Sequence, residues 1–115
     1  DALAVSVGNV HLKTSADTVI DTVALAAIEE VVNCPLVLHG ASGITVKDRR
    51  WLAANTKVCK FNVGTELRQA FGTSLRNVLD NDTNLFDRNQ ILSAVQPALI
   101  EQTKKVLKSI YARDA

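Results

Sequence analysis

The chain has 115 residues, a formal net charge of +1 and 47% hydrophobic residues. It is too apolar for a disordered protein, and its scattered Lys and Arg form no basic stripe for nucleic acid. No apolar run approaches the ~18 residues that a membrane span needs, and no signal peptide is visible. We therefore expect a soluble, cytoplasmic domain that binds neither nucleic acid nor membranes.

The first half of the chain alternates between strand-like and helix-like patterns. Residues 3–7 form a short apolar run, which predicts a buried strand. Residues 21–32 carry apolar side chains at helical spacing, and Pro35 lies just beyond, where a helix should stop. A second short apolar run over residues 35–38 predicts the next strand.

The second half repeats this order. Thr45 and Asp48 have the spacing of a capping box, which predicts the start of a short helix. Residues 57–61 predict a third strand, and a helical pattern follows from residue 65. The tail, residues 87–113, predicts another helix with a kink or a break at Pro97.

Strand followed by helix three times predicts an α/β fold with a parallel sheet. Because the chain is shorter than the roughly 250 residues of a (β/α)8 barrel, we expect part of one. Residues 1–80 would form about three βα units, and residues 81–115 a C-terminal helical extension. The absence of Met also favours a piece of a longer protein. Cys34 and Cys59 are interpreted as two buried free thiols.

The chain has only two histidines, His11 and His39, and each follows the C-terminal end of a predicted strand. That edge of a parallel β/α fold is where ligands bind. One histidine in such a place is more often structural than metal-binding. Two at equivalent positions would face one shared mouth, and zinc accepts neutral imidazole nitrogens. A catalytic zinc needs about three protein ligands, so a third would come from elsewhere.

Two small loops follow the second and third predicted strands. Residues 40–43 are Gly, Ala, Ser and Gly, so their backbone N–H groups could approach an anion closely. A plain tight turn would explain the same residues. Residues 62–65 form a second small polar turn, which could bind phosphate or simply cap the next helix. Taken in order, the two loops predict a phosphate site after the last two strands of a barrel.

Residues 3–11, 35–43 and 60–67 closely resemble the last three strands of class II, zinc-dependent ketose-bisphosphate aldolases. The resemblance covers essentially the whole chain and is nearest to the tagatose-bisphosphate type, because fructose-bisphosphate relatives usually carry Asp where Gly64 stands. It implies the C-terminal part of a TIM (β/α)8 barrel. It also implies zinc-dependent cleavage of a ketose 1,6-bisphosphate into dihydroxyacetone phosphate and an aldehyde phosphate.

The resemblance also implies roles for particular residues. His11 and His39 match two zinc ligands, whereas the catalytic acid/base Asp and a further zinc-binding His would lie upstream. Arg88 matches a residue that in some relatives reaches the substrate of a neighbouring subunit in a homo-oligomer. The phosphorylated ketose or dihydroxyacetone phosphate would contact Leu12, Gly40, Ala41, Ser42, Asn62, Val63, Gly64 and Thr65. A monovalent cation is the second cofactor implied, at the backbone of Leu12, where relatives usually have Gly.

Two alternatives fit the same residues. The first is a non-catalytic half-barrel or degenerate paralogue that binds sugar phosphates or partners without turnover, which Leu12 and the absent front half favour. The second is another lyase of the superfamily, acting on a deoxy or sulfonated sugar phosphate. We expect the isolated chain to be inactive as an aldolase. We also expect it to need a partner, either the missing N-terminal half or a second copy.

Overall fold

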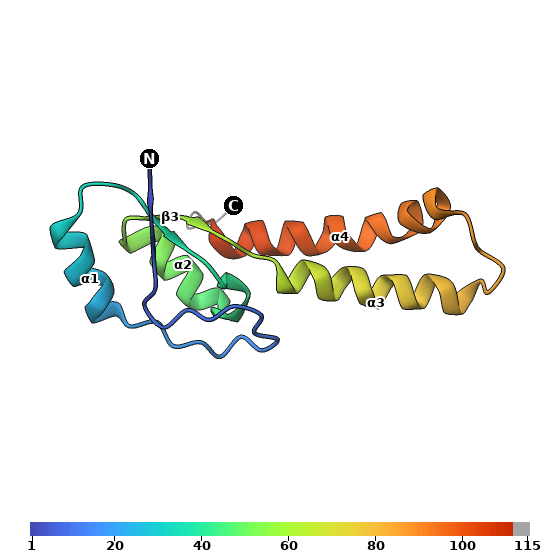
Figure 1. Ribbon diagram of the computed structural model, residues 1–115, viewed down its shortest axis with the longest axis horizontal. Helices are drawn as coiled ribbons and strands as arrows, with labels where there is room; N and C mark the ends of the chain where they lie inside the picture. The colour runs from blue at the N-terminus through green and yellow to red at the C-terminus, as the bar shows by residue number, and fades with distance from the viewer. Residues whose placement is uncertain (112–115) are drawn as a thin grey trace.

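The computed structural model describes residues 1–111, and within them three short parallel strands form one sheet in the order β1-β2-β3. These strands are β1 (Leu3–Val5), β2 (Leu36–Leu38) and β3 (Val58–Phe61). Each lies inside one of the three predicted apolar runs. The predicted α/β fold with a parallel sheet is therefore confirmed (Figure 1).

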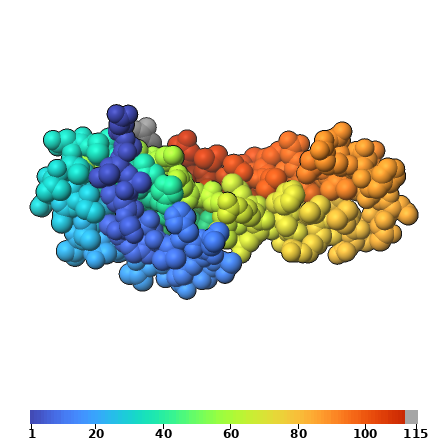
Figure 2. Space-filling view, viewed as in Figure 1, coloured from blue at the N-terminus to red at the C-terminus, as the bar shows by residue number. Residues whose placement is uncertain are grey.

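Helices connect the strands and continue beyond them. Helix α1 (Thr22–Val31) leads from β1 to β2, and α2 (Val46–Asn55) leads from β2 to β3. A short 3-10 helix, η1 (Ala41–Gly43), follows β2. Helices α3 (Thr65–Asn81) and α4 (Arg88–Ile110) form a hairpin that projects from the sheet region and makes the molecule 58 Å long (Figures 1 and 2).

Side-chain caps fix where three of the helices begin. The side chain of Asp21 accepts a hydrogen bond from the backbone N–H of Ala24, and Asp87 caps α4 in the same way. At α2, Thr45 Oγ1 accepts from the N–H of Asp48 at 3.1 Å and donates to Asp48 Oδ2 at 2.7 Å. Each cap satisfies an N–H group that has no partner inside its helix. The predicted helix start at Thr45 is confirmed, although the Asp48 carboxylate accepts from the Thr45 hydroxyl and not from its backbone N–H as in a full capping box.

The core is centred on β2, whose three residues are all buried. A cluster of buried side chains surrounds this strand: Val7, Leu25, Leu36, Leu38, Ala41, Ile44, Leu52 and Val58. The outer strands are much more exposed, because each has one unpaired edge within the described residues. The prediction of two buried thiols is wrong. Cys59 is exposed because it lies on the outer strand β3, and Cys34, which precedes β2, is half-buried.

Helix α4 runs without interruption from Arg88 to Ile110 with Pro97 inside it, so of the predicted kink or break the break does not occur. A proline removes one helical hydrogen bond and pushes on the preceding turn, which a long helix accommodates by bending. In Figure 1 the first turns of α4 are tilted relative to the remainder, as expected for a kink. Within residues 1–111, no helix combines the length and the apolar character that a membrane span requires.

Three residues after the ends of β1 and β2 have positive φ angles: Gly8, Leu12 and Gly40. Gly40 has φ 63°, and a Cβ built on it would lie 2.4 Å from the carbonyl oxygen of Val10. Leu12 has φ 60°, a left-handed conformation that is costly for a residue with a branched side chain. The chain therefore crosses itself closely between Val10 and Gly40, and the loop beyond Val10 is strained at Leu12.

We predict that Gly40→Ala lowers the free energy of unfolding of the intact protein by more than ~1 kcal/mol, because Ala fits neither the dihedral angles nor the space. Gly72→Ala is the matched control. Gly72 lies within α3, and a Cβ there would meet only the end of the Arg76 side chain at 3.5 Å. That control should be stabilised by up to ~1 kcal/mol. Urea unfolding measures both, and equal effects would contradict the close-crossing interpretation.

Leu12→Gly is predicted to raise the free energy of unfolding by up to ~1 kcal/mol, because glycine adopts φ 60° without strain. Little packing is lost, since the Leu12 side chain is 74% exposed. The same change at Leu92, which is 47% exposed and lies in α4, should instead cost ~1 kcal/mol. If both variants lose stability to the same extent in urea titrations, Leu12 is not strained.

Candidate functional site

The C-terminal ends of the three parallel strands meet at one edge of the sheet, and both histidines lie there. His39 directly follows β2, and His11 lies in the loop after β1. Their ring centroids are 5.4 Å apart, with the ring planes inclined at 52°. The structure thus brings together the two histidines that the sequence placed at one shared mouth.

Asn9 joins the ends of β1 and β2 and thereby positions this pair. Its Nδ2 donates to the carbonyl oxygen of His39 at 3.0 Å, and its Oδ1 accepts from the N–H of Val7 at 2.8 Å. Sequence reasoning missed this role. The available signal was the position of Asn9 between a glycine and the next histidine, at the end of a strand. Asn often bonds nearby backbone groups in such turns.

The ring of His39 faces the side chain of Asn62, which follows β3. Asn62 Nδ2 lies 3.1 Å from Nδ1 and 3.0 Å from Nε2 of that ring. A neutral imidazole has only one nitrogen that accepts, so the amide donates to one of the two. In this orientation the amide competes with a metal ion for the lone pair. Turning the amide over would let Asn62 Oδ1 accept from the ring N–H and leave the other nitrogen free for a metal.

Within residues 1–111 there is no group of three or more His, Cys, Asp or Glu side chains that could hold a metal ion. His11 and His39 have the right chemistry for zinc, and their spacing fits two ligands of one ion. They remain one ligand short of the three or so that a catalytic zinc uses. The residues present therefore fit part of a zinc site.

A cavity of about 210 Å³ opens beside the histidines. Its lining draws on all three strand ends: His11, Leu12, Lys13, Gly40, Ser42, Asn62, Val63, Gly64, Thr65 and Arg68. Every predicted substrate-binding residue except Ala41 lines it, and Ala41 is fully buried. The two loops predicted to bind phosphate thus share one cavity.

Two cationic side chains in this lining, Lys13 and Arg68, were missed by the sequence reasoning. Lys13 forms an ion pair with Asp17, and hydrogen bonds from Lys13 and then from Ser15 lower the pKa of the Asp17 carboxyl. The Arg68 guanidinium folds back toward Gly64, at the start of α3. The available signals were a Lys just after His11 and an Arg in the first turns of α3. Cations beside backbone N–H groups favour an anionic ligand.

The hydroxyl of Ser42 is aimed at the beginning of α3. Its Oγ accepts a hydrogen bond from the backbone N–H of Glu66 at 3.3 Å. Because the oxygen acts as the acceptor in that contact, the hydroxyl hydrogen remains available to an anion. Ser42 is 8% exposed, so its position is set by packing as well as by this bond.

Arg88 does not belong to this cavity. It is the first residue of α4, at the outer end of the α3–α4 hairpin, whereas the histidines lie at the sheet (Figure 1). The structure therefore separates it from the other predicted site residues of the same chain. Its predicted contact with the substrate of a neighbouring subunit stays a prediction.

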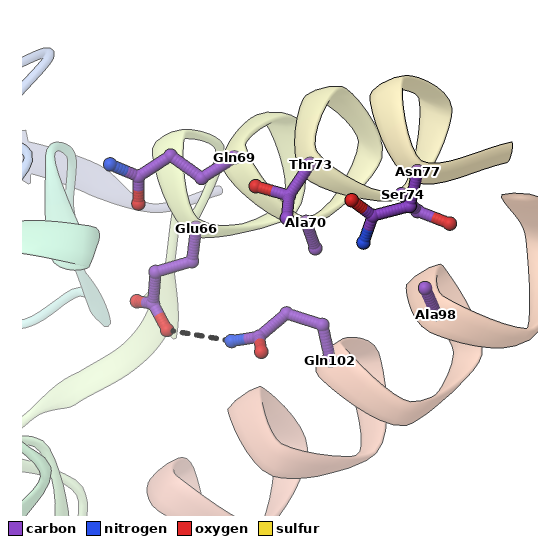
Figure 3. Close-up of a pocket in the computed structure, with 8 residues that line it drawn as sticks. All are labelled: Glu66, Gln69, Ala70, Thr73, Ser74, Asn77, Ala98 and Gln102. Carbon is purple, nitrogen blue, oxygen red and sulfur yellow. Dashed lines mark hydrogen bonds between the residues drawn. The ribbon is translucent and has the colours of Figure 1, made fainter. Parts of the chain in front are cut away.

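A larger hollow of about 440 Å³ lies between α3 and α4 (Figure 3). Its lining is mostly amides, hydroxyls and small side chains: Glu66, Gln69, Ala70, Thr73, Ser74, Asn77, Ala98 and Gln102. At its inner end Gln102 Nε2 donates to Glu66 Oε2 at 3.3 Å. None of the predicted site residues lines this hollow.

Two comparisons with known proteins both point to aldolases. Residues 1–114 match the family described as fructose-bisphosphate aldolase class-II. The crystal structure of the YdjI aldolase from Escherichia coli K12 is similar over 97% of this chain, with 27% sequence identity and a TM-score of 0.71. The chain spans 39% of the length of that aldolase. The predicted partial aldolase barrel is thereby confirmed, and the chain belongs to the class II fructose-bisphosphate aldolase family.

Proposed function

We propose that the intact protein carrying this chain is a zinc-dependent aldolase for a ketose 1,6-bisphosphate of the tagatose or fructose type. Its products would be dihydroxyacetone phosphate and an aldehyde phosphate. The observation that carries the proposal is the pair His11 and His39, with ring centroids 5.4 Å apart, beside a cavity lined by cations and loop residues. Membership of the aldolase family supports the same reaction.

His11 and His39 would hold the zinc ion, together with a histidine from outside the described residues. Zinc bound there would supply a Lewis acid that polarises the substrate carbonyl. Asn62 would orient the His39 ring by accepting its N–H, after the amide turns over as described above. The acid/base Asp that moves the proton would also come from outside the described residues.

The phosphate of the substrate would bind to the loop after β2 and the start of α3. The backbone of Gly40, the hydroxyls of Ser42 and Thr65 and the charges of Lys13 and Arg68 supply donors to one cavity. Anchoring the phosphate away from the reacting carbon orients the substrate without altering the chemistry itself. Fructose-bisphosphate relatives usually carry Asp at the position of Gly64. The glycine here therefore supports the tagatose type of substrate.

Leu12 favours a second candidate, a relative that binds sugar phosphates without turnover. Leu12 is one of the residues that line the cavity, and its backbone is strained at φ 60°. Zinc content of the purified intact protein, together with cleavage of fructose and tagatose 1,6-bisphosphates, separates the two candidates. Phosphate binding without zinc or cleavage would favour the second. The monovalent cation, the homo-oligomer and the cytoplasmic location stay predictions.

His39→Ala in the intact protein is predicted to lose zinc and aldol cleavage together, with activity falling at least ~100-fold, because the ion loses a ligand. Metal analysis and an enzyme-coupled assay for dihydroxyacetone phosphate measure the two properties. Cys59→Ser is the control, because the exposed thiol of Cys59 on β3 could take up zinc adventitiously. A His39→Ala variant that keeps both zinc and activity would show that the metal assignment is wrong.

Ser42→Ala is predicted to raise the Michaelis constant for the ketose bisphosphate about tenfold, the effect of losing one hydrogen bond to a charged group. The turnover number should change much less, because the phosphate lies away from the reacting carbon. Ser74→Ala removes the same hydroxyl from the hollow between α3 and α4 and should leave the constant unchanged. An unchanged constant for Ser42→Ala would mean that residues 40–43 are only a turn.

A further inference from the structure

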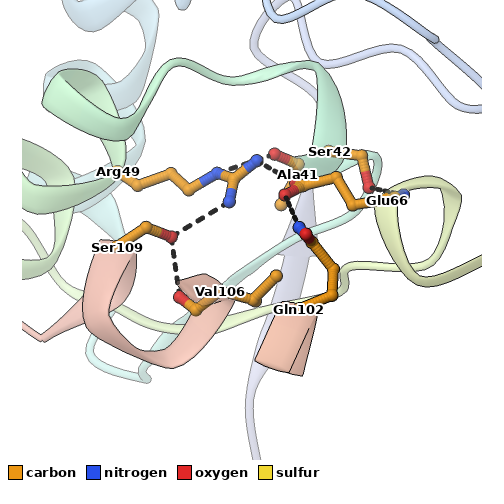
Figure 4. A network of polar contacts seen from close by, with 7 residues as sticks. All are labelled: Ala41, Ser42, Arg49, Glu66, Gln102, Val106 and Ser109. Carbon is orange, nitrogen blue, oxygen red and sulfur yellow. Dashed lines mark hydrogen bonds and ion pairs between the residues drawn. The ribbon is translucent and has the colours of Figure 1, made fainter. Parts of the chain in front are cut away.

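Arg49 is a charged residue inside the protein, at 2% exposure, on the inner face of α2. Its guanidinium reaches three other elements (Figure 4). Nε donates to the carbonyl oxygen of Ala41 at 3.0 Å, Nη1 donates to Ser109 Oγ at 3.0 Å, and Nη2 pairs with Glu66 Oε1. One side chain thus joins α2 to the loop of residues 40–43, to α3 and to α4.

Such a side chain is costly to bury unless its charge is paired and its N–H groups are bonded. Here a carboxylate, a carbonyl and a hydroxyl surround it, so the cost is offset by directional contacts. Directional contacts fix geometry in a way that an apolar side chain of the same size would not. The carbonyl of Ala41 lies in the middle of the loop that lines the cavity with Gly40 and Ser42.

Glu66 transmits the same constraint to the start of α3. One carboxylate oxygen pairs with Arg49, and the other accepts from Gln102 Nε2 at 3.3 Å. Its backbone N–H donates to Ser42 Oγ at 3.3 Å. The network therefore bonds the loop at two neighbouring residues, through the carbonyl of Ala41 and the hydroxyl of Ser42.

We propose that Arg49 is a positioning residue for the phosphate subsite. It holds the loop of residues 40–43 and the first turn of α3 in the arrangement that directs their donors into the cavity. It does not line the cavity itself and so acts only through Ala41 and Glu66. The inference rests on the proposed function only in taking a phosphate group as the ligand of this loop.

The test compares the intact wild-type protein with Arg49→Met and with the double variant Arg49→Met/Glu66→Gln. The single change leaves the Glu66 carboxylate without its partner and should lower the melting temperature. The double change removes that unpaired charge, keeps the backbone N–H of residue 66, and should recover much of the melting temperature. Neither variant provides a donor for the carbonyl of Ala41, so neither should restore the loop.

Binding of inorganic phosphate, measured by calorimetric titration, is the main readout, with the Michaelis constant and turnover number for a ketose bisphosphate beside it. Both variants should bind phosphate about tenfold more weakly or worse, since small displacements of a positioned group are costly. The Michaelis constant should rise similarly, with little change in turnover number. Ser109→Ala removes a partner of Arg49 that is not in the loop, and phosphate binding should then stay within about twofold. If Arg49→Met does not fold, the double variant, which lacks the unpaired carboxylate, carries the test alone.

The outcomes separate this inference from the proposed function. A double variant that regains both stability and wild-type phosphate affinity would show that Arg49 only stabilises the fold, and the inference would be wrong. Absence of phosphate binding by the wild type would also overturn it. If the wild type binds phosphate and both variants bind it weakly, but no ketose bisphosphate is cleaved, the positioning role stands and the proposed function fails.

Discussion

The close crossing between Val10 and Gly40 is the constraint on which the site depends. No side chain fits there, because a Cβ on Gly40 would lie 2.4 Å from the Val10 carbonyl oxygen. The crossing places His11, the next residue after Val10, against His39, the residue before Gly40. The 5.4 Å between the two rings is a direct result of this backbone contact and of the parallel pairing of β1 with β2. The strain at Leu12 lies in the same loop, one residue beyond His11.

The same edge of the sheet gathers two kinds of chemistry that an aldol cleavage of a phosphorylated sugar would need. The imidazoles provide neutral nitrogen ligands, and the loops at residues 40–43 and 62–65 provide backbone and hydroxyl donors with Lys13 and Arg68 close by. These groups come from segments far apart in the sequence. The parallel sheet brings these groups to one edge, and the buried contacts of Arg49 tie the loop of residues 40–43 to the helices behind it.

The sequence predicted those features whose signals are local. Strand runs, the helix start at Thr45 and the residues at the strand ends each depend on a few neighbouring positions. Side chains placed by tertiary packing were missed. Nothing in the helical pattern of α2 marks Arg49 as buried, because its partners Ala41, Glu66 and Ser109 lie on three other elements. The exposure of Cys59 was missed for a similar reason, since edge and central strands have the same apolar pattern.

The geometry of α4 limits what Arg88 can do. The helix begins at Arg88 and is anchored near its other end, where Ser109 accepts a hydrogen bond from Arg49. Twenty-one residues of helix at ~1.5 Å each separate the two by roughly 30 Å. Helix α4 comes near the cavity already at Gln102, which contacts Glu66 at the start of α3, and fourteen residues of helix, or ~20 Å, separate Gln102 from Arg88. An arginine side chain is much shorter than this distance, so any substrate that Arg88 contacts must be bound to another molecule.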